Sequence, residues 1–214
     1  MRDIIVATLN EGKLNDFKFI LRDYNVIGMK EAGIDVDIEE TGLSFMNNAL
    51  LKAHFVNDYI LNRDKKYFDG VILSDDSGLL VDALNGFPGI VTKRFLGVNV
   101  SDQDRNSFII NELNKIPNCN RRAEVCTTVV AIKDGDNIYQ STGEIEGVIT
   151  LEERGKNGFG FDSIFQVTYD KGNANYTGRY DGLTLAELPT REKNRISSRR
   201  RALNKFIKAG VFNN

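Results

Sequence analysis

The sequence is poor in residue types that define whole classes of proteins. Its 214 residues include two cysteines, one histidine, three prolines and no tryptophan. Cys119 and Cys126 have a spacing that matches no metal-binding motif, and no histidine lies near them in the sequence. We therefore expect neither a disulfide framework nor a structural zinc site, and two reduced thiols indicate a cytoplasmic protein.

Long apolar runs and a strong net charge are also missing. No segment approaches the roughly 18 apolar residues of a membrane span, and the apolar part of MRDIIVATLN is too short for a signal peptide. The net charge of −2 creates no electrostatic field that would attract nucleic acid or an anionic membrane. We expect neither partner. No proline-rich or serine-rich linker interrupts the chain, which predicts one large domain or two lobes without a flexible tether.

The sequence does contain apolar periodicities of both the strand and the helix type. Short β-branched runs predict buried strands, and apolar residues at helical spacing predict helices. Ser101 with Asp104 forms a plausible capping box, and KDGDN is a typical hairpin turn. The predicted order is strand 4–8, helix 14–21, helix 44–60, strand 71–73, helix 101–116, strand 122–132, strand 138–150 and a basic helical segment over the last 25 residues. This pattern predicts an α/β protein with a mixed sheet.

The stretch LSDDSGLLV places two carboxylates between apolar runs. Adjacent buried carboxylates are costly unless a cation or a proton compensates them. The Ser77-Gly78 pair predicts that the strand ends there, and ligands of open α/β sheets sit at the carboxyl ends of strands. Strand alternation would place Asp75 and Asp76 on opposite faces, so only one of them could enter a given site. The alternative is a turn with an Asx-type hydrogen bond.

Two loops offer groups that could complete such a site. TLNEGK connects a strand to a helix, so its free backbone N–H groups and Lys13 could bind phosphate, although such connections are common without a ligand. EETG supplies Glu39 and Glu40, which are either a solvated turn or, together with the Asp pair, ligands for Mg²⁺.

The second half of the chain has two further candidate segments. NGFGFD combines glycines for close backbone approach with aromatic rings for base stacking, or forms a hinge with core phenylalanines. In TREKNRISSRRRAL, a cap at Ser197 would end one helix and start another. Arg199 would then lie in a first turn, where a cation opposes the helix dipole. A bound anion or a carbonyl ligand explains that position better than stability does.

Five stretches, in their order and spacing, resemble the inosine triphosphate pyrophosphatase family, the Ham1-like group. They are IVATLNEGKL, EETGLSFMNNALLKA, SDDSGLLVDALNGFPGI, GFGFDSIF and LAELPTREKNRISSRRRAL, and together they run from about residue 3 to residue 207. The resemblance implies an α/β fold of the Maf/Ham1-like type, with an elongated mixed β-sheet, flanking helices and two lobes around a central cleft. Residues 1–214 would then form a single two-lobed nucleoside triphosphate pyrophosphatase domain.

The resemblance also implies an activity and a set of site residues. It implies a homodimer that hydrolyses non-standard purine nucleoside triphosphates (ITP, dITP and XTP) to the monophosphate and pyrophosphate with Mg²⁺. Asp76 matches the catalytic base, and Glu40 and Asp76, with Asp75 beside them, match the metal ligands. The matching substrate-binding positions are Thr8, Asn10, Glu11, Gly12, Lys13, Lys52 and Ser77 near the phosphates, and Phe159, Gly160, Phe161, Asp162, Lys193, Ser198 and Arg199 near the nucleoside.

Two positions depart from the family pattern. Ser198 stands where the family usually has histidine, and Ser163 where it usually has proline. The phosphate chemistry should survive these changes, while the base preference stays open. The alternatives are a family member with altered base preference, a nucleotide-binding protein without turnover, and a nucleic-acid-binding module that uses the basic tail 191–208. The net charge and the acidic first half argue against the last of these.

Overall fold

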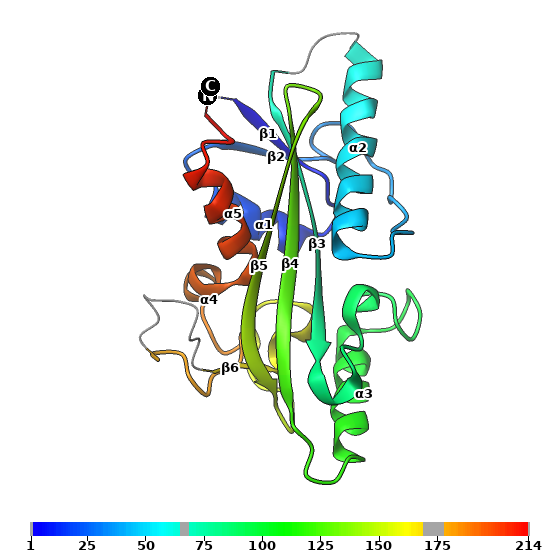
Figure 1. Cartoon of the computed structure of the whole chain (residues 1–214), viewed down its shortest axis with the longest axis vertical. Helices are drawn as coiled ribbons and strands as arrows, with labels where there is room; N and C mark the ends of the chain where they lie inside the picture. The colour runs from blue at the N-terminus through cyan, green and yellow to red at the C-terminus, as the bar shows by residue number, and fades with distance from the viewer. Residues whose placement is uncertain (1, 65–68, 169–177, 214) are drawn as a thin grey trace. The chain divides into compact units, whose positions relative to one another are not determined.

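The computed structural model describes residues 2–64, 69–168 and 178–213, and these form a mixed α/β fold. Six strands lie in one sheet in the order β2-β1-β3-β4-β5-β6 (Figure 1). β1 pairs in parallel with β2 and β3, and β5 pairs antiparallel with β6. The strands are β1 (Asp3–Val6), β2 (Asn25–Gly28), β3 (Val71–Val81), β4 (Arg122–Lys133), β5 (Asn137–Ile149) and β6 (Phe165–Val167). The helices are α1 (Glu11–Ile20), α2 (Phe45–Asp64), α3 (Asp102–Asn114), α4 (Thr190–Ile196) and α5 (Ser198–Lys208). The predicted α/β class is confirmed.

The chain divides into two compact units, defined here as unit 1 and unit 2. Unit 1 comprises residues 1–76, 127–143 and 199–214, and unit 2 comprises residues 77–126 and 144–198. Among the described residues, no helix has the length and apolar character required to cross a membrane.

In unit 1 the sheet is covered on both faces, because alternate residues of its strands point to opposite sides. Ile4 and Leu73 share a buried cluster with apolar residues of α1 and α5. Ile5 and Ile72 share another with Ala49 and other residues of α2. Figure 1 accordingly shows α2 on one side of the strands of this unit and α1 and α5 on the other. Near-continuous apolar strands are typical of a sheet that is buried on both faces.

Unit 2 has a separate core. Leu79, Ile109, Val125 and Phe165 belong to one buried cluster, which thus draws on β3, α3, β4 and β6. The N-terminus of α3 is capped as predicted, because Ser101 Oγ accepts a hydrogen bond from the Asp104 backbone N–H at 3.1 Å.

The prediction that β3 ends at Ser77-Gly78 is wrong, because β3 continues to Val81. Leu79 and Val81 are fully buried in the core of unit 2, and this burial favours continued extended structure over a turn. The strand that does end at this point is β1. Its last residue, Val6, pairs with Leu73, so the Asp pair follows directly beyond the carboxyl end of β1.

The ends of other predicted elements can be compared with the helices and strands of the structure. The predicted helix break at Ser197 is confirmed, since this extended residue separates α4 from α5. Ile116 lies outside α3, which ends at Asn114. The short strands β2 and β6 were not predicted, because four and three residues carry too little periodicity to be recognised.

Candidate functional site

The loop between β1 and α1 is a compact helix-capping turn. Asn10 is the N-cap residue of α1, and its Oδ1 accepts a hydrogen bond from the Lys13 backbone N–H at 3.0 Å. The Asn10 backbone N–H in turn donates to Thr8 Oγ1 at 3.1 Å. Thr8 and Asn10 therefore shape the turn that brings Lys13 to the carboxylates beyond β1.

Asp75 lies at the centre of a buried charge network in unit 1. Its side chain is 1% exposed, and its Oδ2 lies 3.2 Å from Lys13 Nζ and 2.9 Å from Arg199 Nη2. Burial by itself would raise the pKa of Asp75, but the neighbouring charges of Lys13 and Arg199 outweigh it and hold this pKa well below its usual range. Asp75 is therefore an ionised carboxylate whose charge is compensated by neighbouring cations.

Arg199 is held by carboxylates of two different elements. Its Nη1 donates to Asp16 Oδ2 of α1 at 2.8 Å, and its Nε and Nη2 donate to Asp75 Oδ2 at 3.3 and 2.9 Å. The guanidinium carbon also lies 5.5 Å from the centre of the Phe17 ring. The sequence favoured a bound anion or a carbonyl ligand for an arginine in the first turn of α5, whereas the partners that the structure shows are two carboxylates of the protein itself, Asp16 and Asp75.

Asp76 faces α2, on the opposite side of the strand from Asp75. Asn48 Nδ2 donates to Asp76 Oδ2 at 2.8 Å, and Asn48 Oδ1 accepts from the Gly42 backbone N–H at 2.8 Å. Lys52 Nζ donates to Glu40 Oε1 at 2.5 Å and to the Asp75 carbonyl at 2.7 Å. Strand alternation thus separates the two aspartates as predicted. Asn48 ties the loop that carries Glu40 to the strand that carries Asp76.

The pKa shifts of Asp76 and Lys13 have opposite directions. Burial raises the pKa of Asp76, Lys13 and Lys52 oppose that rise, and Glu40 adds to it. Burial lowers the pKa of Lys13, which Asp75 opposes, while Lys52 and Arg199 lower it further. A buried carboxylate with a raised pKa favours a nearby cation, and a buried lysine with a lowered pKa favours a nearby anion. The site is therefore suited to bind both.

The carboxylates of unit 1 suit Mg²⁺. Glu40 and Asp76 are close enough for the charge of Glu40 to raise the pKa of Asp76, and both offer hard oxygen ligands. Asp75 is engaged by Lys13 and Arg199, so its charge is already compensated. Glu40 and Asp76 fit a divalent cation better than Asp75 does.

In unit 2 the predicted nucleoside residues form a second cluster. Lys193 Nζ of α4 donates to Asp162 Oδ2 at 2.9 Å and lies 4.5 Å from the centre of the Phe159 ring. The same Asp162 oxygen accepts from the Phe159 backbone N–H at 2.9 Å. Gly160, at φ +62°, begins the short 3₁₀ helix Gly160–Ser163 that includes Phe161. Ser77 is half-buried at the start of this unit, and Ser198 is buried at its end.

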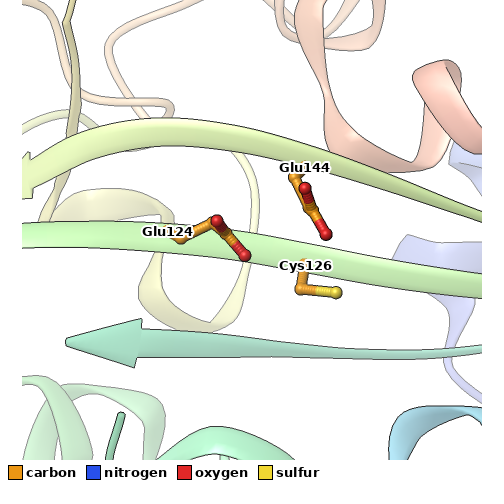
Figure 2. A group of neighbouring side chains, drawn as sticks. All are labelled: Glu124, Cys126 and Glu144. Atoms are coloured by element: carbon orange, nitrogen blue, oxygen red, sulfur yellow. The ribbon is translucent and has the colours of Figure 1, made fainter. Parts of the chain in front are cut away.

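A second group of potential metal ligands lies on the hairpin of β4 and β5. Ligand atoms of Glu124, Cys126 and Glu144 lie within 4.8 Å of one another (Figure 2). Burial raises the pKa of Glu124, and the charges of Glu144 and Glu146 raise it further. Sulfur is a poor ligand for Mg²⁺, which prefers oxygen. The group is therefore not the site that the resemblance implies. Sequence reasoning missed it, although alternation along a hairpin could have placed these residues on one face.

Sequence reasoning also missed three buried polar residues around the predicted ones. Asp16 is three residues after Lys13 and hence on the same face of α1, Asn48 is four residues before Lys52 on α2, and Asn106 contacts the glycine-rich loop. The helical spacing relative to Lys13 and Lys52 was a usable signal for the first two.

Fold and site together define a mixed α/β protein with buried carboxylates, lysines and an arginine gathered beyond the end of a parallel strand. The chain belongs to the Ham1 family, whose model matches residues 4–209. It is 39% identical over 208 residues to a protein of Clostridium tetani (strain Massachusetts / E88) named dITP/XTP pyrophosphatase, covering 96% of this chain and 94% of that protein.

Solved structures agree with this membership. The Staphylococcus aureus Ham1 protein matches with a TM-score of 0.76 at 35% identity, over 98% of each chain. A HAM1 protein from Coxiella burnetii matches with a TM-score of 0.78 at 32% identity, over 99% of each chain.

Proposed function

We propose that this protein is a nucleoside triphosphate pyrophosphatase that hydrolyses dITP, ITP and XTP to the monophosphate and pyrophosphate. The observation that carries the proposal is the arrangement in unit 1 of the carboxylates of Glu40 and Asp76, which suit Mg²⁺, beside the ammonium groups of Lys13 and Lys52, which suit phosphate. The relatives' name, dITP/XTP pyrophosphatase, supports the same substrate class.

Lys13 and Lys52 would bind the triphosphate, together with the backbone N–H groups at the start of α1 near Glu11 and Gly12. Lys13 is held toward the site by Asp75, and Lys52 by Glu40 and the Asp75 carbonyl. Because these contacts fix both ammonium groups before substrate arrives, little reorganisation is needed as charge develops on the phosphates.

Asp76 would accept the proton of the attacking water. The water oxygen attacks the α-phosphorus, the bond from that phosphorus to the bridging oxygen breaks, and pyrophosphate leaves with the bonding electron pair. Asn48 holds one oxygen of Asp76, which orients the carboxylate. Mg²⁺, held by Glu40 and Asp76, would supply charge neutralisation on the phosphate oxygens.

The residues of unit 2 would select the base. Hypoxanthine and xanthine have a carbonyl at position 6, which accepts hydrogen bonds, whereas adenine has an amino group there. A cationic donor such as Lys193 cannot pair with that amino group, and an unpaired buried donor carries a penalty. Phe159 would stack on the base, and Ser198 would contact it in place of the larger histidine of the family pattern. Guanine also has a carbonyl at position 6, so the site must reject guanine through its 2-amino group.

The test is pyrophosphate release from ITP, dITP, XTP, GTP, ATP and dTTP with Mg²⁺. We expect kcat/KM for ITP and XTP to exceed that for ATP by about 100-fold or more, and EDTA to abolish turnover until Mg²⁺ is restored. Equal cleavage of ATP and ITP would refute the carbonyl-donor argument. Absence of turnover on every substrate would leave a nucleotide-binding protein instead. The homodimer and the cytoplasmic location stay predictions, and light scattering of the purified protein checks the former.

A further inference from the structure

Asn106, in the second turn of α3, is a buried residue whose side-chain amide faces the glycine-rich loop. The residue is 3% exposed. Asn106 Nδ2 lies 3.0 Å from the Gly160 carbonyl, 3.1 Å from Ser163 Oγ and 3.2 Å from Glu153 Oε2. A carbonyl can only accept hydrogen bonds, so the amide must present its NH₂ group to Gly160. Asn106 therefore links three points of the segment between residues 153 and 163.

A second residue of α3 holds the same loop residue, Gly160. Asp102 Oδ2 accepts a hydrogen bond from the Gly160 backbone N–H at 2.8 Å. Asp102 and Asn106 are four residues apart and lie on one face of the helix. The N–H and the C=O of Gly160 are thus both bound to α3. Gly160 has φ +62°, a conformation that favours glycine, and these two contacts fix it there.

Ser163 and Glu153 close the cluster from the other end of the turn. Ser163 Oγ donates to Glu153 Oε2 at 2.5 Å while it accepts from Asn106. A hydroxyl can do both at once. The short 3₁₀ helix Gly160–Ser163 is therefore tied at its first and its last residue to the same asparagine.

Between these two ties the loop carries the groups assigned above to the nucleoside. Asp162 Oδ2 accepts from Lys193 Nζ and from the Phe159 backbone N–H, both at 2.9 Å. Because Phe159 precedes Gly160 directly, a rotation about the backbone bonds of Gly160 would move the ring relative to Asp162 and Lys193. The contacts from α3 restrain that rotation.

We propose that Asn106 and Asp102 are positioning residues for base selectivity, acting through Gly160 on Phe159 and Asp162. Ser163 and Glu153 assist by holding the far end of the 3₁₀ helix. This inference rests on the proposed function, since it takes the base to bind at Phe159 and Asp162. It predicts that loss of the clamp, defined as the contacts of Asn106 and Asp102 with Gly160, weakens discrimination between bases and leaves phosphate binding unchanged.

The test compares Asn106→Ala and Asp102→Ala with Gln103→Ala, a control at an exposed position of the same helix. Asp102 is exposed, so its variant reports on the clamp even if Asn106→Ala does not fold. Binding of dITP and dATP is measured by titration calorimetry in EDTA, and inorganic tripolyphosphate is titrated as a probe for the phosphate side alone. We expect the ratio of dITP to dATP affinity to fall by about tenfold in Asn106→Ala, and by less in Asp102→Ala. Tripolyphosphate affinity should stay within about twofold of wild type in all variants.

Three outcomes would overturn the inference. The first is an unchanged dITP/dATP ratio in both clamp variants. The second is an equal loss of affinity for dITP, dATP and tripolyphosphate, which indicates a general structural defect. The third is a wild-type protein that does not prefer dITP. Wild-type turnover is measured separately. A protein that binds dITP selectively through the clamp but releases no pyrophosphate would refute the proposed function and support the inference. Asp102→Asn, which keeps an acceptor for the Gly160 N–H, should restore the ratio.

Discussion

Asp75 in unit 1 and Asp162 in unit 2 are both buried aspartates, yet their surroundings differ. Asp75 Oδ2 contacts two cationic side chains, Lys13 and Arg199, and Arg199 is bound in turn by Asp16. Asp162 Oδ2 contacts Lys193 Nζ and the Phe159 backbone N–H. The first arrangement sets the charge of a site, and the second sets the shape of a loop. Unit 1 should therefore govern turnover and electrostatics, and unit 2 should govern which base is accepted.

The largest predicted effect concerns Asp76 in unit 1. Asp76→Asn keeps the shape and the contact region of the side chain but removes the proton acceptor and a charged metal ligand. We expect kcat to fall by about 100- to 10,000-fold on every substrate, measured as pyrophosphate release under saturating dITP. Asp69→Asn, at an exposed position before β3, is the control and should retain full turnover. An Asp76→Asn enzyme with normal kcat would show that the catalytic assignment is wrong.

Asp75→Asn tests the charge network itself. The substitution leaves the buried Arg199 and the half-buried Lys13 without this counter-charge, and breaking a buried pair in this way costs about 3 to 5 kcal/mol. We expect Tm at neutral pH to fall by about 10 °C. Because the pKa of Asp75 is depressed, the lost stabilisation is present above the ordinary carboxyl pKa and disappears as the pH falls. The wild-type and variant Tm values should therefore converge in acid.

A surface ion pair provides the matched control for this measurement. Glu31 and Lys18 are 2.6 Å apart, but their side chains are 50% and 40% exposed. Glu31→Gln should change Tm by less than about 2 °C, because exposed pairs contribute little. Equal Tm losses in Asp75→Asn and Glu31→Gln would contradict the view that the network of unit 1 is electrostatically strong.

Lys193→Met tests the role of unit 2 in binding the base. Methionine retains the length of the side chain and its contact with Phe159, but it cannot donate to Asp162. We expect KM for dITP to rise by about tenfold while kcat changes much less, because the lost contact belongs to base binding. Arg195→Met, at an exposed position of α4, is the control. A fall in kcat without a rise in KM would place Lys193 with the phosphate chemistry instead.

The sequence predicted the fold class and most elements, because apolar periodicity reports directly on burial. It also predicted that Asp75 and Asp76 face opposite sides, because alternation is a local property of a strand. It failed on the end of β3. Ser77-Gly78 looks like a terminator locally, but the core of unit 2 buries Leu79 and Val81 and keeps the strand extended.

The partners of the predicted residues were harder to find from the sequence. Arg199 binds Asp16, which is 183 positions away in the chain, and no local pattern indicates such a contact. Asn48 and Asn106 lie within helices, where a polar residue usually suggests a solvated face, yet both are buried by tertiary packing. Motifs can locate the groups that carry chemistry, whereas the residues that hold them depend on how distant elements pack.

The smallest predicted effect concerns the acidic cluster on β4 and β5 of unit 2. Burial raises the pKa of Glu124, and Glu144 and Glu146 raise it further, so the folded state holds the Glu124 proton more tightly than the unfolded chain does. Stability therefore falls as the pH rises through the raised pKa, which is the opposite of the behaviour of Asp75. Glu124→Gln should raise Tm at pH 7 by about 1 to 2 °C, and the gain should vanish near pH 4. Thermal melts at both pH values, with the exposed Glu152→Gln as control, check this. A lower Tm at pH 7 would mean that a cation compensates the charge of the Glu124 carboxylate. Glu124 would then resemble Asp75 of unit 1, and the electrostatic contrast between the two units would be weaker.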